Sequence, residues 1–408
     1  MTSYYGENVS NLNLGKFGVF KYFVIFFILI WSLKIWFIDF TVLIIIFGMF
    51  LLLTSSEIRI NKKINLLFFC IYFLLIYSLI LIVFKTEGET SFFYPIKYLR
   101  VLISYFFIYA IIYYFFNENK IFDQGQVRKV IFALGYVLLL QPIFMVLQLV
   151  SLDFYYFMLG FMPTTGAFNG FRARGLMTGT SSGGQFLGYI SIYFAFIAVK
   201  YNSKFFLLIF IGLLPLFPLS AIAGLVPYLF AFLYLIIYRF NLKRLVFILF
   251  LIFTFLVAVF TIFNQSENFQ KGFTRILILI GDDEQHLSKS HPINSFNSLI
   301  RSIDLPDDGF QLLFGNAQPS KSTHATTNTD SGYFTNIHAF GLLGTLFLLF
   351  TISLFYFLTK SNFFLIFLVS YLIVFFKNDM SFGRIVFNYV FVIFSLFIIN
   401  KNFRWFFR

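Results

Sequence analysis

The chain alternates between long apolar runs and short polar segments. Uncharged runs of roughly 17–25 residues are long enough to cross a bilayer as helices. Backbone polar groups in lipid must pair internally, so a membrane-spanning chain forms either helices or a closed barrel. The apolar positions here are continuous rather than alternating, which excludes the barrel. The pattern therefore predicts an all-α polytopic membrane protein.

We expect about twelve transmembrane helices, with residues 1–408 forming a single integral membrane domain. The predicted spans are 17–33, 37–54, 64–84, 95–116, 128–149, 184–201, 204–219, 222–239, 245–263, 333–358, 362–376 and 385–400. The first two spans are nearly continuous, because only the segment between Lys34 and Asp39 separates them. Gln141-Pro142 predicts a kink in the fifth span, either structural or opening toward a cavity.

Composition agrees with this pattern. The chain is 60% hydrophobic and 23% aromatic, and it contains 67 Phe residues, which excludes an ordinary soluble domain. The first apolar run lacks a following small-residue cleavage site, so we expect it to be retained as a helix. Cys70 is the only cysteine, which excludes a disulfide within the chain and a cysteine zinc site.

Charge predicts the orientation of the spans. If the N-terminus is cytoplasmic, 17 of the 30 Lys and Arg residues and four acidic residues fall on the cytoplasmic side. That side then carries the whole formal charge of +13, and both termini are cytoplasmic. The basic balance is therefore explained by membrane topology and does not indicate nucleic-acid binding.

Two long segments fall on the opposite side of the membrane, at about 151–183 and 264–332. Loops of this length are usually functional or disordered. The second segment contains the apolar stretches "RILILI" and "FQLLF", which favour partly helical structure over disorder.

The first long segment contains "RARGLMTGTSSGG", which leads into the sixth span. Guanidinium groups bind phosphate through two parallel hydrogen bonds, and a helix N-terminus adds free backbone N–H groups. Arg172 and Arg174 therefore predict a phosphate cradle at the membrane surface. The alternative is that both arginines anchor the chain to lipid headgroups and the glycines serve only as loop residues.

The second long segment offers further candidates. Arg275 and Arg301 are candidate anion ligands, or partners in ion pairs with Asp282 and Asp304. The acidic run "GDDEQH" has no spacing typical of a metal site and is interpreted as a solvated turn, so we predict no metal.

"STHATTNTDSGYF" then leads into the tenth span. His324 could accept a proton near neutral pH, or it is a solvated loop histidine. Asp330 is a candidate acid-base residue or a helix N-cap. His338, within the span, is interpreted as a buried helix histidine.

Arg100 lies within or near the outer end of the fourth span. A charge inside a membrane is costly and by default indicates function with a partner group. The alternative is that its side chain reaches toward the interface, as the neighbouring Lys97 can.

In order and placement, these features resemble the O-antigen polymerase (Wzy) family. Twelve spans with two large outer loops, after spans five and nine, match its layout. The stretch 172–183 is similar to the family's Arg-x10-Gly spacing, and "TRILILIGD…NSLIRSI…LLFGNA" looks like its paired-arginine stretch before a Leu-Phe-Gly motif. "DSGYFTNIHAFGLLG" looks like its closing block, with Gly-x-x-Gly opening an apolar helix. Two features depart from the pattern, because His324 precedes Asp330 by six residues and Leu312 stands where an Arg301-x10-Gly spacing would need glycine.

The resemblance implies a glycosyltransferase that joins polyprenyl-diphosphate-linked oligosaccharide repeats at the periplasmic face of the bacterial inner membrane, during lipopolysaccharide O-antigen synthesis. The expected substrate is an undecaprenyl-diphosphate-linked oligosaccharide, and no cofactor is expected. A chain-length regulator and a flippase are the candidate protein partners. Together with the chemistry of these side chains, the resemblance implies a role for each candidate residue. Tyr333 would stack on or hydrogen-bond to sugar, and His324 or Asp330 would be the catalytic base or its orienting partner. The substrate-binding residues would be Arg172, Arg174, Arg275, Arg301 and Arg100.

Three alternatives stay open. An O-antigen ligase uses the same donor but transfers the glycan to the lipid A core. A polysaccharide-lipid flippase is a transporter, a class that usually has short loops. A peptidoglycan polymerase has a similar substrate class, but its motifs find no convincing match in this chain.

Overall fold

The computed structural model describes residues 16–31, 34–35, 38–54, 58–84, 92–117, 122–161, 173–177, 180–217, 220–239, 305–306, 308–316, 332–376 and 384–408. Within these ranges the regular structure is helical apart from one small hairpin, in which β1 (Lys34–Ile35) pairs antiparallel with β2 (Ile38–Asp39). This hairpin occupies the short segment between the first two predicted spans.

The α-helices follow the apolar runs closely. They are α1 (Lys16–Ile30), α2 (Phe40–Thr54), α3 (Lys62–Val83), α4 (Phe93–Phe116), α5 (Gln124–Val150), α6 (Leu152–Phe161), α7 (Thr180–Lys200), α8 (Lys204–Gly212), α9 (Leu225–Arg239), α13 (Gly309–Phe314), α14 (Gly332–Phe357), α15 (Asn362–Phe375), α16 (Arg384–Ile399) and α17 (Arg404–Phe407). The described part also contains the short 3-10 helices η1 (Leu214–Leu216), η2 (Ile222–Gly224) and η4 (Lys401–Phe403).

The chain is an all-helical, multi-pass membrane protein. In the described part, five helices are long and apolar enough to cross a membrane: α3, α4, α5, Ser182–Lys200 of α7, and α14. A sixth is obtained when Ile385–Ile399 and Lys401–Phe407, which meet at 117°, are taken as one broken span. The other apolar helices, of 10–17 residues, are shorter, so the twelve-span layout stays a prediction.

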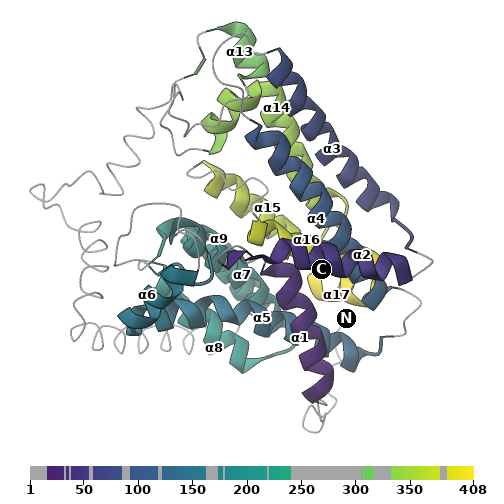
Figure 1. Cartoon of the computed structure of the whole chain (residues 1–408). Helices are drawn as coiled ribbons and strands as arrows, with labels where there is room; N and C mark the ends of the chain where they lie inside the picture. Colours follow the sequence, from purple (N-terminus) through teal and green to yellow (C-terminus); the bar gives the residue numbers. More distant parts are fainter. Residues whose placement is uncertain are drawn as a thin grey trace, which may run out of the picture.

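The helices form two groups joined through a shared centre. Figure 1 shows α3, α4 and α14 running together toward α13, whereas α5, α7 and α8 lie at the other end of the view. Helix α16 packs against α4 and α1, and α15 packs against α7, α9 and α14. Because lipid tails are as apolar as these side chains, association of the helices depends on close packing rather than on the hydrophobic effect.

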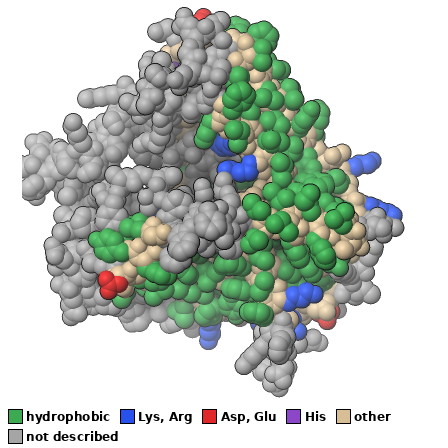
Figure 2. Space-filling model, in the orientation of Figure 1, with side chains coloured by type: hydrophobic (Ala, Val, Ile, Leu, Met, Phe, Trp, Pro, Cys, Tyr) green, Lys and Arg blue, Asp and Glu red, His purple; other side chains and the backbone are tan. Residues whose placement is uncertain are grey.

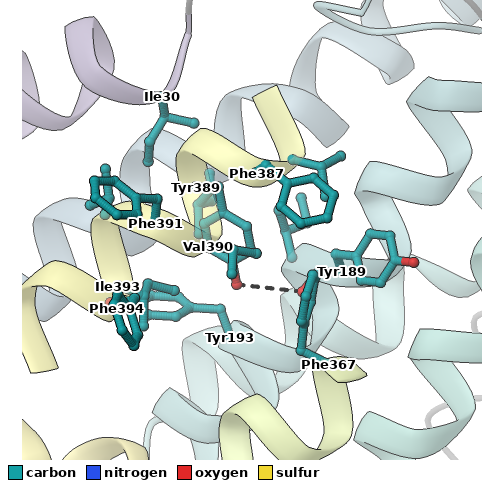
Figure 3. Packing of buried hydrophobic residues seen from close by; sticks show 14 of the residues in the cluster. Ile30, Tyr189, Tyr193, Phe367, Phe387, Tyr389, Val390, Phe391, Ile393 and Phe394 are labelled. Carbon is teal, nitrogen blue, oxygen red and sulfur yellow. Dashed lines mark hydrogen bonds between the residues drawn. The ribbon is translucent and has the colours of Figure 1, made fainter. Parts of the chain in front are cut away.

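Aromatic side chains supply that packing at the centre. Tyr189 and Tyr193 of α7, Phe367 of α15 and Tyr389 of α16 are all buried there (Figure 3). The Tyr389 hydroxyl donates to the Tyr189 carbonyl at 3.5 Å, and the Tyr189 and Phe367 rings lie 5.2 Å apart. Aromatic pairs of this kind contribute about 0.5–1.5 kcal/mol each beyond the area that they bury.

Much of the described outer surface is apolar. Hydrophobic side chains cover much of the described surface in Figure 2, where Lys and Arg appear only as isolated patches. Leu53, Val83 and Val150 are more than three-quarters exposed. Apolar surface on this scale is unfavourable in water and fits contact with lipid chains.

In the described part, two short helices lie within the segments predicted as loops. Helix α6 occupies 152–161, where the sequence predicted no element, whereas α13 confirms partly helical structure around "FQLLF". Asp308 is the N-cap of α13 and accepts from the N–H groups of Phe310 and Gln311 at 3.3 and 3.2 Å. Helix α5 continues through Pro142 to Val150, so the predicted kink does not interrupt the helix.

Candidate functional site

The turn at Arg174–Met177 rests on α5, where the Gln148 amide binds its backbone. The Gln148 side-chain oxygen accepts from the N–H groups of Arg174 and Gly175 at 3.0 and 2.9 Å. Its nitrogen donates to the Gly175 carbonyl at 2.9 Å. One buried side chain therefore satisfies three backbone groups that the apolar surroundings would otherwise leave unpaired.

Gln141, two turns earlier on α5, joins the same turn to the start of α7. Its side-chain oxygen accepts from the Leu176 N–H at 2.9 Å. Its nitrogen donates to the carbonyls of Arg174 at 3.0 Å and Gly183 at 3.4 Å. Residues seven apart lie on the same face of a helix, so the two glutamines act as one polar clamp. We call Gln141 and Gln148 the amide clamp.

Two glycines of the predicted phosphate cradle are needed for this close approach. Gly175 has φ +62°, and a Cβ there would lie 2.5 Å from the Gln141 amide nitrogen. A Cβ at Gly183 would lie 2.5 Å from the Arg174 carbonyl oxygen. Both positions exclude any larger side chain unless the backbone shifts.

The clamp places the Arg174 guanidinium in the interior. Its side chain is 2% exposed, and Nη2 donates to the Met158 carbonyl of α6 at 3.0 Å. Within the described part of the chain, Nε and Nη1 have no hydrogen-bond partner. Burial lowers the pKa of the Arg174 guanidinium, and the nearby Tyr155 phenol of α6 opposes that shift.

A buried cation with unpaired donors is unfavourable unless an anion accompanies it. A phosphate group can accept from two guanidinium N–H groups at once. Arg174 therefore has the chemistry of an anion ligand, close to the N-terminal turn of α7, where the helix dipole also favours negative charge. Arg174 is poorly suited to act as a general acid or base, because a guanidinium keeps its proton.

A second junction lies where α13 meets α14. Helix α14 is broken at Gly341, which has φ 66° and ψ −177°. A Cβ at Gly341 would lie 2.1 Å from the Leu313 carbonyl oxygen of α13, and one at Gly315, with φ +83°, would lie 2.5 Å from Ala339. The Asn316 N–H donates to the His338 carbonyl at 2.8 Å. We call this contact between Leu313–Asn316 and His338–Gly341 the glycine junction.

Tyr77 of α3 contacts both segments of the glycine junction. Its hydroxyl lies 3.0 Å from the Phe314 carbonyl and 2.9 Å from the Phe340 carbonyl, each in reach of its single proton. Because the polar groups of the glycine junction pair with each other, we interpret the junction as a structural contact between α13 and α14. It accounts sterically for the Leu-Phe-Gly and Gly-x-x-Gly patterns seen in the sequence.

The described residues include three of the predicted site residues. Arg174 is buried, as above. Tyr333 lies in the first turn of α14, where its hydroxyl donates to the Leu372 carbonyl at 2.8 Å and its ring packs 4.8 Å from Phe375. Arg100 is half-buried, two turns from the start of α4. Arg172, Arg275, Arg301, His324 and Asp330 lie outside the described residues.

The structure brings Arg174 together with the start of α7, and Tyr333 together with α15. Helices α7 and α15 themselves pack against each other. His338 is buried in α14, as the sequence predicted. Sequence reasoning missed Gln148 and saw Gln141 only as part of a kink. The available signal was two amides seven residues apart in an otherwise apolar span.

No family model, curated protein or solved structure matches this chain. The functional assignment therefore depends on the residues themselves.

Proposed function

We propose that the chain is an O-antigen polymerase, a glycosyltransferase that joins polyprenyl-diphosphate-linked oligosaccharide repeats. The observation that carries the proposal is the Arg174 guanidinium, which is buried at the start of α7 with Nε and Nη1 unpaired in the described part. A lipid-borne diphosphate would supply the missing acceptors. The order of the sequence motifs supports the same substrate.

In the proposed reaction, the growing glycan moves from its lipid diphosphate to a hydroxyl of the next lipid-linked repeat. The bond between sugar and phosphate breaks, and a bond from the sugar to the acceptor oxygen forms. Negative charge accumulates on the departing diphosphate, which positioned guanidinium groups stabilise. The acceptor proton passes to a base, for which His324 and Asp330 are the candidates. Arg172, Arg275 and Arg301 are proposed to complete the diphosphate site.

The proposal includes a particular topology. Twelve spans place both termini in the cytoplasm and the segments 151–183 and 264–332 in the periplasm, with the chain in the inner membrane. The undecaprenyl carrier then enters from the outer leaflet, and a flippase and a chain-length regulator act beside the polymerase.

The test uses a host lacking this gene and complemented with the full chain. Loss of a polymerase leaves lipopolysaccharide capped with one repeat, whereas loss of a ligase leaves bare core. Complementation by wild type should restore the ladder of repeats, and Arg172→Lys and Arg301→Lys should not, because lysine lacks the planar fork. Bare core in the deletion host, or full ladders with both variants, would contradict the proposal.

A transporter is the second candidate, and the break of α14 at Gly341 favours it. Interrupted membrane helices often line the substrate sites of transporters. A transporter defect would retain single lipid-linked repeats on the cytoplasmic side. The same deletion host distinguishes the two, since a polymerase defect still delivers one repeat to the lipopolysaccharide.

A further inference from the structure

Four cationic side chains meet at one end of the helix bundle. Lys63 lies at the start of α3, and its Nζ donates to the Leu358 carbonyl just after α14, at 2.6 Å. Lys360, Arg404 and Arg408 lie close enough to Lys63 to act on it electrostatically. We call these four residues the basic cluster. It lies at the end that the charge count predicts to be cytoplasmic, where α3 begins and α14 ends.

The fold of the C-terminal segment fixes the cluster in place. After α16, the chain turns by 117° into the short segment Lys401–Phe407. The Arg404 guanidinium donates to the last-turn carbonyls of Phe397 and Ile398 at 3.1 and 3.3 Å. The Ser361 hydroxyl donates to the Phe407 carbonyl.

Asn362, next to Ser361, makes a second hydrogen bond to the C-terminal segment. The Asn362 amide donates to the main-chain oxygen of Arg408. Phe406 and Phe407 are fully buried, which anchors the segment against the bundle. Hydrogen bonds from side chains to main-chain oxygens therefore bring together three separate parts of the chain that carry these charged residues.

Lys360 supplies an independent observation. It follows α14 with φ +50°, the left-handed region, and its N–H donates to the Tyr356 carbonyl at 2.7 Å. Glycine or asparagine fills this position at the end of a helix at lower cost. A lysine there places a further positive charge beside three others despite the strain, and such outliers cluster at functional positions.

The surroundings favour an anion carried by a lipid. Among the described residues, the charged groups that act on Lys63 are Arg404, Lys360 and Arg408, and a bound anion would relieve the mutual repulsion of these cations. Phe357, beside the cluster at the end of α14, is 57% exposed, and Trp405 also reaches the surface. Exposed apolar groups next to cationic residues suit a ligand that carries both an acyl chain and a phosphate, and tryptophan is enriched at membrane–water interfaces.

We propose that the basic cluster binds the phosphate group of an anionic phospholipid headgroup at this end of the bundle. Basic pockets between membrane helices are typical sites for such headgroups. The site is separate from the Arg174 site and does not depend on the function proposed for it.

The test uses the purified full-length protein in detergent. Native mass spectrometry would measure the retention of phosphatidylglycerol, of phosphatidylcholine, and of inorganic phosphate. The variant is Lys360→Asn with Arg408→Gln, which removes two charges and leaves the Arg404 and Lys63 contacts in place. The matched control is Lys204→Gln with Lys401→Gln, two exposed lysines that are not among the charges acting on Lys63.

The expected result is preferential retention of phosphatidylglycerol over phosphatidylcholine by wild type and control. The variant should lose about 25-fold in phosphatidylglycerol affinity, roughly fivefold for each charge. Inorganic phosphate at millimolar concentration should not displace the lipid. Equal phosphatidylglycerol affinity in variant and control would overturn the proposal. So would phosphate binding without lipid selectivity, which would indicate a soluble anion as the ligand.

Discussion

The amide clamp and the glycine junction both hold a segment that does not cross the membrane against a membrane helix, but in opposite ways. The clamp uses two side chains of α5 to bind the backbone around Arg174. The junction uses the absence of side chains, so that Leu313–Asn316 contacts α14 directly. The clamp leaves two guanidinium donors unpaired in the described part, whereas the junction matches its polar groups internally. This difference supports the proposed role of Arg174 as an anion ligand, and it supports a structural role for the junction.

The strongest way to test the junction is Gly341→Ala. A Cβ at this position meets the Leu313 carbonyl oxygen at 2.1 Å, and the backbone has φ +66°. The combined strain and clash should cost about 4 kcal/mol or more, enough to prevent accumulation of folded protein. Size-exclusion profiles of a fluorescent fusion would show this. Gly309→Ala is the control, since a Cβ there meets nothing within 4 Å. A monodisperse Gly341→Ala protein at wild-type yield would contradict the geometry of the junction.

The clamp is tested next by Gln148→Ala. The substitution leaves two N–H groups and one carbonyl of the Arg174 turn without their partner. We expect a loss of about 2–3 kcal/mol, seen as a lower thermal unfolding midpoint in detergent. Gln124→Ala, at the exposed first residue of α5, is the matched control and should leave the midpoint unchanged. Equal midpoints for the two variants would show that the turn does not depend on the clamp.

Tyr77→Phe should have the smallest effect. It removes the hydroxyl that reaches the Phe314 and Phe340 carbonyls but keeps the ring, which packs 6.5 Å from Phe340. The expected loss is about 1 kcal/mol, the typical contribution of one hydrogen bond. Tyr72→Phe, an exposed residue on the same helix, is the control for the same unfolding measurement. A loss as large as that of Gly341→Ala would mean that Tyr77, rather than the glycines, holds the junction.

Much of the helical fold could be predicted because it follows from continuous apolar runs. Every predicted span except 245–263 overlaps an apolar helix of the described part, but only five or six of these helices are long enough to cross a membrane. The span 245–263 lies outside the described residues. Helix α6 was missed because its ten residues are too few to cross a bilayer, so the span criterion assigned them to a loop.

The site was predictable only in part. Arg174 was identified from its residue type, its neighbours and its position before a helix. Its glutamine partners lie 26 and 33 residues earlier in the chain, and that pairing depends on how α5 packs against the turn. The Gly-x-x-Gly pattern indicated a special helix start, but the break at Gly341 arises from contact with α13, which local sequence does not determine.

The most direct test of the central claim is the polymer made by Arg174→Lys in the deletion host. Lysine keeps the positive charge but loses the planar set of donors, so the proposed diphosphate contact should weaken. We predict at least a tenfold loss of polymerised repeats, with protein yield and unfolding midpoint close to wild type, since loss of one transition-state donor typically costs about 100-fold or more. Arg128→Lys, whose guanidinium packs over Phe132 and Tyr201, is the control and should keep the full ladder. A full ladder from Arg174→Lys would contradict the assignment of Arg174 as an anion ligand.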